Sequence, residues 1–167
     1  MICCSTQYCH LTIINWFHIN TGTCDSIVAA CYLVTQLQTI VSRNISPLDS
    51  AVLTIGEIHG GYNYNIIADK AEVIGTVRTF RPETKNYVEQ RIHEICKGIE
   101  HSYNVKIDVL YKRGYPATIN HTDIGVDTIK AAVEPVIGKD AIQTPLGTMA
   151  AEGIKTTYVS TKFITMY

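Results

Sequence analysis

The stretch from Gly60 to Phe80, GGYNYNIIADKAEVIGTVRTF, constrains the fold more than any other part of the chain. Glycine tolerates positive φ, so the Gly60-Gly61 pair is suited to end the apolar run over 51–59 at a turn. A polar loop follows, and a second extended run occupies 70–80. The stretch therefore predicts two strands joined by an irregular loop.

The loop and the second of these strands carry polar side chains that suit an anion. Asn63 and Asn65 have amides that can donate and accept hydrogen bonds, and Arg78 has a planar guanidinium that fits a carboxylate. Strand side chains alternate, so Arg78 is expected on the face opposite Val77. The plain alternative is that Arg78 pairs with a nearby carboxylate at the surface. His59 is interpreted as a surface residue next to the turn.

Two more elements are predicted before this stretch. Residues 8–19 are rich in β-branched and aromatic side chains and predict a strand. A helix follows, with Thr23 or Asp25 as its cap and its end near Arg43. Asn44 in a left-handed conformation and Pro47 are expected to stop it. Its predicted buried stripe is Ile27, Ala30, Val34, Leu37 and Val41.

Two elements are predicted after the stretch. Pro82 and Glu83 suit the first turn of a helix to about Ser102. The run 105–112 alternates apolar and polar residues, which is typical of a strand with one covered face. The order β-α-β-β-α-β predicts an α+β, ferredoxin-like fold, with two helices on one face of a four-stranded antiparallel sheet. The buried stripe of the second helix is predicted to be Val88, Ile92, Ile95 and Ile99.

The remaining residues predict a separate segment. Gly114-Tyr115-Pro116 breaks the pattern, so the chain is divided into a domain over 8–113 and a segment over 114–167. A short helix is expected from Thr122 or Asp123 through Val136, ended by Gly138. This segment either packs on the sheet domain or belongs with another domain.

Composition narrows the function classes. A net charge of −1 offers no basic surface for nucleic acid, and no apolar run reaches the roughly 20 residues of a membrane span. The first residues lack a secretory signal, so a cytoplasmic location is expected. Cys3, Cys4, Cys9 and His10 have metal-binding side chains, but their spacing fits no paired Cys-x2-Cys pattern, and we interpret the cysteines as reduced thiols.

Three motifs resemble a known family. They are Gly60-Gly61, then Asn65-Ile66-Ile67-Ala68-Asp69, then Gly75-Thr76-Val77-Arg78. In this order they resemble the lid or dimerisation domain of the zinc-dependent amidohydrolases typified by hippurate hydrolase, indole-acetyl-amino-acid hydrolase and aminoacylase. Ala68 stands where that family has proline. The resemblance extends over about 25–153, with weaker matches at 114–116, Asn120 and 149–152.

The resemblance implies a homodimer in which two lids join their sheets edge to edge. It also implies that Asn65 and Arg78 hold the carboxylate of an N-acyl amino acid. The intact family binds zinc or manganese, but its His/Cys-Gly-His motif and its Glu-Glu pair are absent here, and His18 matches the family histidine only loosely. We therefore predict no catalytic and no metal-binding residue in this chain, and residues 114–167 as a remnant of the following catalytic segment with a divergent tail.

The expected function is that of a lid and dimerisation module that does not hydrolyse amides alone. One alternative is an amide hydrolase that becomes active when a partner chain brings the metal centre. Another is a ferredoxin-like binding module of other function, such as an RNA-binding sheet. The predicted middle strands lack a basic-aromatic RNA-binding pattern, which disfavours RNA.

Overall fold

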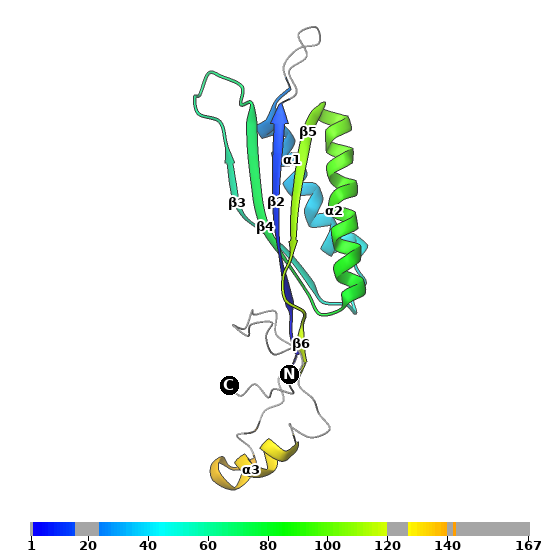
Figure 1. Ribbon diagram of the computed structural model, residues 1–167, viewed down its shortest axis with the longest axis vertical. Coiled ribbons are helices and arrows are strands. Elements are labelled where there is room, and N and C mark those ends of the chain that lie inside the picture. Colours follow the sequence, from blue (N-terminus) through cyan, green and yellow to red (C-terminus); the bar gives the residue numbers. More distant parts are fainter. Residues whose placement is uncertain (1, 16–23, 120–126, 140–141, 143–167) are drawn as a thin grey trace.

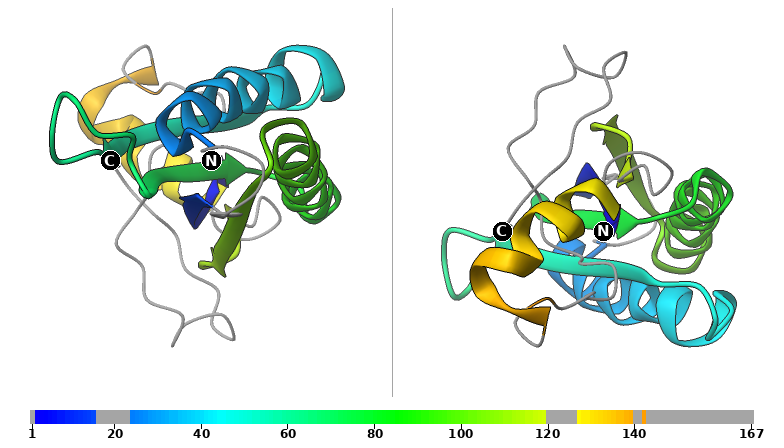
Figure 2. Two further views of the ribbon diagram at one scale, coloured as in Figure 1. Left: turned by 90° about the horizontal axis from the view of Figure 1, so that it is seen from above. Right: turned by 90° about the horizontal axis from the view of Figure 1, so that it is seen from below.

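A four-stranded antiparallel sheet with two helices on one face forms the body of the molecule (Figures 1 and 2). The computed structural model describes residues 2–15, 24–119, 127–139 and 142. Its sheet has the order β3-β4-β2-β5, with every neighbouring pair antiparallel. The predicted α+β class and β-α-β-β-α-β order are confirmed. The elements of this body are β2 (Ser5–Asn15), α1 (Ser26–Thr39), the π-helical turn η1 (Ile40–Asn44), β3 (Ala51–Gly60), β4 (Lys70–Thr79), α2 (Pro82–Tyr103) and β5 (Val105–Arg113).

The register of the sheet decides which side chains share a face. The pairing of β2 with β4 runs without interruption from Ser5–Thr79 to Ile14–Lys70. The pairing of β3 with β4 shifts between Ile55 and Glu57, so β3 carries a bulge with one extra residue. The two edges of the sheet are β3 and β5.

The hydrophobic core lies between the sheet and the helices. The predicted stripe of α2 is confirmed, because Val88, Ile92, Ile95 and Ile99 are all buried. The predicted stripe of α1 is partly wrong. Its buried residues are Ser26, Ala29, Ala30, Leu33 and Leu37, followed by Ile40 of η1, while Ile27 is exposed and Val34 and Val41 are half-buried.

The helix ends follow local chemistry. Asp25 caps α1, since its Oδ1 accepts hydrogen bonds from the backbone N–H groups of Ile27 at 2.9 Å and Val28 at 3.1 Å. Pro82 is the first residue of α2, as predicted. The left-handed cap predicted at Asn44 is wrong. Here the helix closes through a π-helical turn, with the Ile45 N–H donating to the Ile40 carbonyl, and the left-handed asparagine is Asn104, after α2.

One pairing of strands was not predicted from the sequence. Two short strands, β1 (Ile2–Cys3) and β6 (Thr118–Ile119), form an antiparallel ladder next to the body. Helix α3 (Asp127–Ile137) lies beyond this ladder, away from the sheet in Figure 1, and none of its residues is buried. Within the described part of the chain, α3 therefore adds nothing to the sheet-domain core.

Some predictions fall outside the described residues. They are the end of the first predicted strand after Asn15, His18, the proposed cap at Thr122 or Asp123, and the weak matches at Asn120 and 149–152. None of the described helices combines the length and the hydropathy needed to cross a membrane.

Candidate functional site: the β3–β4 loop, Arg78 and the β3 edge

The loop between β3 and β4 presents Asn65 at the surface. The loop begins at Gly61, whose φ of 77° requires glycine-like freedom. It ends on two hydrogen bonds, from Ser26 Oγ to the Ala68 carbonyl at 2.8 Å and from the Asn15 N–H to the Asp69 carbonyl at 2.7 Å. Ala68 is buried, whereas residues 62–67 project outward. The loop is thus fixed at its ends and exposed at its tip.

Asn65 lines an open hollow of about 380 Å³ between the loop and the start of α1. Asp25 and Ile27 supply the helix side of this hollow. Because Asp25 already accepts the first free N–H groups of α1, the helix terminus is not available to an anion. The amide of Asn65 can still donate one hydrogen bond to a ligand without adding charge.

Arg78 lies near the opposite end of β4, between Val52 of β3 and Thr6 of β2. It is half-buried and on the face away from the helices, as the alternation predicted. The strand advances by eight residue steps from Lys70 to Arg78, which corresponds to about 26 Å. A single chain therefore does not bring Asn65 and Arg78 to the same small ligand.

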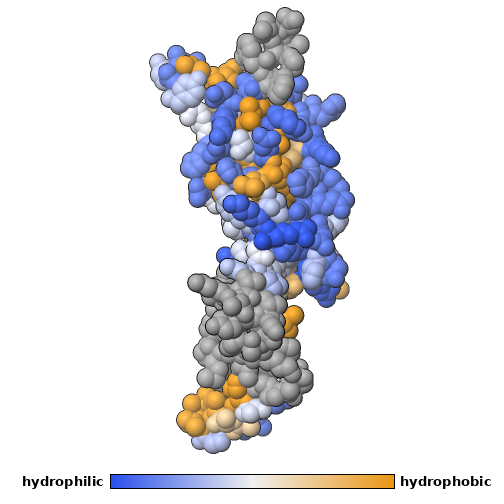
Figure 3. Space-filling view, in the orientation of Figure 1, coloured by the Kyte–Doolittle hydropathy of each residue, from blue (hydrophilic) through white to orange (hydrophobic). Residues whose placement is uncertain are grey.

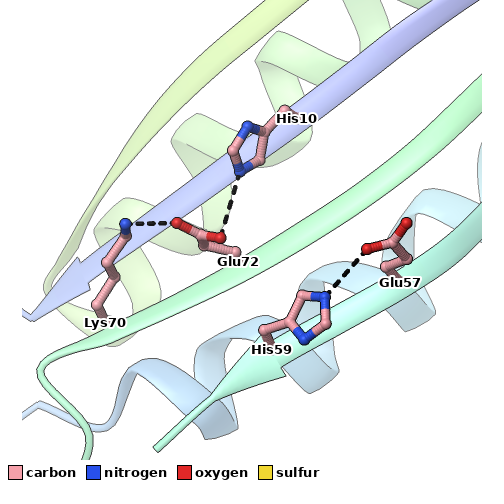
Figure 4. Close-up of polar contacts among 5 residues, drawn as sticks. All are labelled: His10, Glu57, His59, Lys70 and Glu72. Atoms are coloured by element: carbon pink, nitrogen blue, oxygen red, sulfur yellow. Dashed lines mark hydrogen bonds and ion pairs between the residues drawn. The ribbon is translucent and has the colours of Figure 1, made fainter.

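The same open face carries an ionic cluster that the sequence did not indicate (Figure 4). Glu72 forms an ion pair with Lys70 and lies 3.8 Å from the Nε2 atom of His10. The hydrogen bond from Lys70 is the main reason why the pKa of Glu72 falls below its usual value. At the neighbouring edge, His59 lies 3.1 Å from Glu57 and is exposed, as expected of a surface residue.

Figure 3 shows apolar residues scattered among polar ones over the sheet domain. Tyr8 is the one exposed aromatic side chain on the described strands of this sheet, and Lys112 lies 5.8 Å from the centre of its ring. Glu72 interrupts the positive charges of this face. The face thus lacks the row of stacking rings that single-stranded RNA needs, and the RNA-binding alternative gains no support.

A metal centre does not fit the described residues, in which no three His, Cys, Asp or Glu side chains gather to hold an ion. Cys9 is buried among core residues, while its neighbour His10 lies on the opposite face, so these two cannot converge on one ion. Burial raises the pKa of Cys9 and of Cys96 to about 12, which keeps both thiols protonated near neutral pH.

The β3 edge is open to another strand. Its sequence AVLTIGEIHG contains neither proline nor lysine, the residues that commonly block edge pairing. The other edge, β5, carries Lys106, Lys112 and Arg113. The two edges therefore differ in their lysine and arginine content. This difference is expected if β3, and not β5, pairs with a second chain.

The fold defines an α+β module with a four-stranded antiparallel sheet, two helices on one face and β3 at an edge. The family model described as the peptidase dimerisation domain of the M20 family matches residues 18–104, more than half of the chain. The chain belongs to this family, which confirms the resemblance to the amidohydrolase lid.

Curated relatives support the same assignment. The chain is 46% identical over 112 residues to an N-acetyldiaminopimelate deacetylase of Priestia megaterium, a match that covers 67% of this chain and 30% of that protein. It is 45% identical over 103 residues to the deacetylase of Brevibacillus brevis, covering 62% and 27%. The chain thus spans less than a third of the length of each of these two deacetylases.

Solved structures show the same fold. A protein assigned as an aminohydrolase, from methicillin-resistant Staphylococcus aureus, superimposes with a TM-score of 0.71 and 31% identity, over 89% of this chain and 39% of that one. A dinuclear metal-binding M20 peptidase from Bacillus subtilis gives a TM-score of 0.61 and 24% identity, over 90% and 36%.

Proposed function

We propose that this chain is the dimerisation and substrate-contacting module of an M20 amidohydrolase that acts on N-acyl amino acids. In this proposal the chain self-associates and binds the substrate carboxylate, while the hydrolytic metal centre lies outside the described residues. The observation that carries the proposal is the open β3 edge on a domain whose family is defined by dimerisation.

Pairing through β3 has a definite geometry. Two identical edge strands that pair antiparallel are related by a two-fold axis perpendicular to the sheet, as expected of an isologous dimer. The joint sheet then has eight strands, with the helices of both copies on the same face. This rotation reverses the direction of each strand in one copy relative to the equivalent strand in the other.

The two-fold axis accounts for the separation of Asn65 and Arg78. Asn65 lies at the end of the sheet where β4 begins, and Arg78 lies where β4 ends. In the inverted copy these ends are exchanged, so Asn65 of one copy and Arg78 of the other lie at the same end of the joint sheet. Two to three strand spacings, or about 10–14 Å, separate them laterally. We propose that each ligand contacts Asn65 of one copy and Arg78 of the other.

The substrate class follows from the groups involved. Arg78 suits a carboxylate, and Asn65 can bond the acyl or amino-acid part without a charge. The deacetylase relatives act, by their names, on an N-acetylated amino acid that fits this description. The second candidate is an active hydrolase complemented by a metal-binding chain, which is favoured by the fact that this chain spans 30% of a complete relative.

Mixing two variants tests the shared site. Asn65→Ala and Arg78→Ala chains are each expected to lose binding of an N-acetyl amino acid in a calorimetric titration. An equimolar mixture should regain about a quarter of the parent sites, because half the dimers are mixed and each holds one intact site. If the parent binds but the mixture does not, the site does not span two copies.

A further inference from the structure

One of the three basic residues of β5 differs from the other two in what it contacts. Lys106 and Arg113 form ion pairs with glutamates of α2. Lys112 is exposed, and in the described part of the chain it forms no ion pair with a carboxylate. Its ammonium group lies instead 5.8 Å from the centre of the Tyr8 ring. The positive charge of Lys112 is therefore still available to an anionic ligand.

The register of the sheet places Lys112 on the same face as Arg78. Tyr8 of β2 pairs with Lys112 on one side and with Thr76 of β4 on the other. Arg78 lies two positions beyond Thr76, so its side chain points to the same face. Two strand spacings and two residue steps thus separate the Cα atoms of Arg78 and Lys112, a distance of about 12 Å.

Tyr8 determines the direction in which Lys112 points. Its strand, β2, lies between β4 and β5, so an ammonium group over the Tyr8 ring is turned toward Arg78. The ring itself meets the ring of His10 edge to face, with 6.4 Å between the centres. An aromatic face attracts a cation, and this attraction holds the lysine over the sheet.

The spacing of the two cations suits a ligand with two acidic groups. Arginine and lysine side chains each extend up to about 6 Å from the Cα atom, so their charged ends can approach well within the 12 Å between the Cα atoms. An extended amino acid with a carboxylate at each end spans roughly 7–8 Å between its carboxyl carbons. Such a ligand can contact both cations across β2.

We propose that Lys112 is a specificity-determining residue that binds a second carboxylate of the ligand, and that Tyr8 positions its ammonium group. The inference rests on the proposed function, in which Arg78 holds the first carboxylate. The ligand class is then an N-acyl amino acid with a carboxylate at each end. N-acetyldiaminopimelate, the compound in the names of the deacetylase relatives, is of this class.

The strand order is compatible with this extension of the site. In the proposed dimer, Asn65 of the other copy approaches Arg78 from the β3 side. Lys112 lies on the opposite side of Arg78, beyond β2. The ligand would therefore extend outward from the two-fold axis, with its second carboxylate farthest from the axis.

Two ligands that differ in one carboxylate provide the test. N-acetyldiaminopimelate and Nα-acetyl-lysine are identical except for the carboxylate at the far end. In a calorimetric titration the parent chain should bind the dicarboxylate about three- to tenfold more tightly, a ratio between those of an exposed ion pair and of a charge-assisted hydrogen bond. Lys112→Met, which keeps the apolar stem without the charge, should bind both ligands equally. Lys112→Arg should retain the preference.

Lys106→Met is the matched control. It removes the same charge from the same strand and the same face, but six positions farther along β5. The ratio of the two dissociation constants should stay at the value of the parent. Thermal melting verifies that each variant is folded, and Lys112→Gln replaces Lys112→Met if the latter does not fold.

The outcomes separate the two proposals. If the parent binds both ligands equally, or if Lys112→Met keeps the preference for the dicarboxylate, this inference is wrong while the proposed function stands. If the parent binds neither ligand at up to about 10 mM, a range that includes weak specific sites, both proposals are wrong.

Discussion

Arg78 illustrates how a residue's role depends on its surroundings. Strand alternation places its side chain on the open face of the sheet, opposite the core residue Val77. The same position beside Thr6 and Val52 is compatible with an internal surface pair or with a ligand contact. The two interpretations differ in what the loss of the guanidinium would change.

Replacing Arg78 separates these interpretations. A charge-assisted hydrogen bond in a partly dry site contributes about 1.5–3 kcal/mol, so Arg78→Ala should weaken binding of an N-acetyl amino acid roughly ten- to a hundredfold. The melting temperature should change little. Calorimetric titration and thermal melting measure the two effects, with Arg43→Ala at an exposed position as the control.

The internal-pair interpretation gives the opposite result. If the parent binds measurably, and Arg78→Ala melts several degrees lower while binding equally well, then Arg78 is a structural residue and does not contact the ligand.

Among the elements, the two edge strands show how composition controls association. β5 presents lysine and arginine, and β3 presents a bulge at Gly56, between Ile55 and Glu57. The bulge increases the local twist, and Glu57 beside it is the one acidic side chain of β3, a strand that has no lysine or arginine. Dimerisation should therefore be sensitive to a single added charge in β3.

Two glycines allow a matched test of this element. A Cβ atom added at Gly56 or at Gly98 of α2 meets no atom within 4 Å, so lysine fits at both positions. Gly56→Lys should abolish the dimer at concentrations of about 100 μM, because lysine blocks edge pairing. Gly98→Lys should leave it intact and slightly stabilise α2, since lysine favours helix over glycine by roughly 0.5–1 kcal/mol.

Size-exclusion chromatography and sedimentation provide the measurement. Equal self-association of the two lysine variants would show that β3 is not the interface.

At the scale of the whole molecule, hydrolytic activity depends on whether the described residues can form a metal site with a catalytic base. Hydrolysis by a metal-activated water needs ligands that converge from several segments and a carboxylate base. No such set is gathered in the described ranges, where the open face offers ion pairs within β3 and within β4 and one contact between His10 of β2 and Glu72 of β4. Binding and catalysis are thus expected to reside in different parts of an intact amidohydrolase.

The purified chain is accordingly expected to hydrolyse no N-acyl amino acid and to bind zinc only weakly. Equilibrium dialysis against zinc and an assay for released amino acid test this directly. Stoichiometric zinc with micromolar or tighter affinity, together with turnover that a chelator abolishes, would contradict the prediction.

The sequence by itself determined the order of elements, the core of α2 and the face of Arg78. These follow from local periodicity: Val88, Ile92, Ile95 and Ile99 repeat with the helical period, and strand side chains alternate. The family motifs around Asn65 also lie within one short stretch of chain and needed no tertiary information.

Only the tertiary structure decided how these parts are placed relative to one another. The position of α1 beside the sheet edge determines that Ile27 is exposed, and the strand order makes β3 an edge. The strand order and the placement of α1 depend on contacts between segments remote along the chain, which no local pattern of residues encodes.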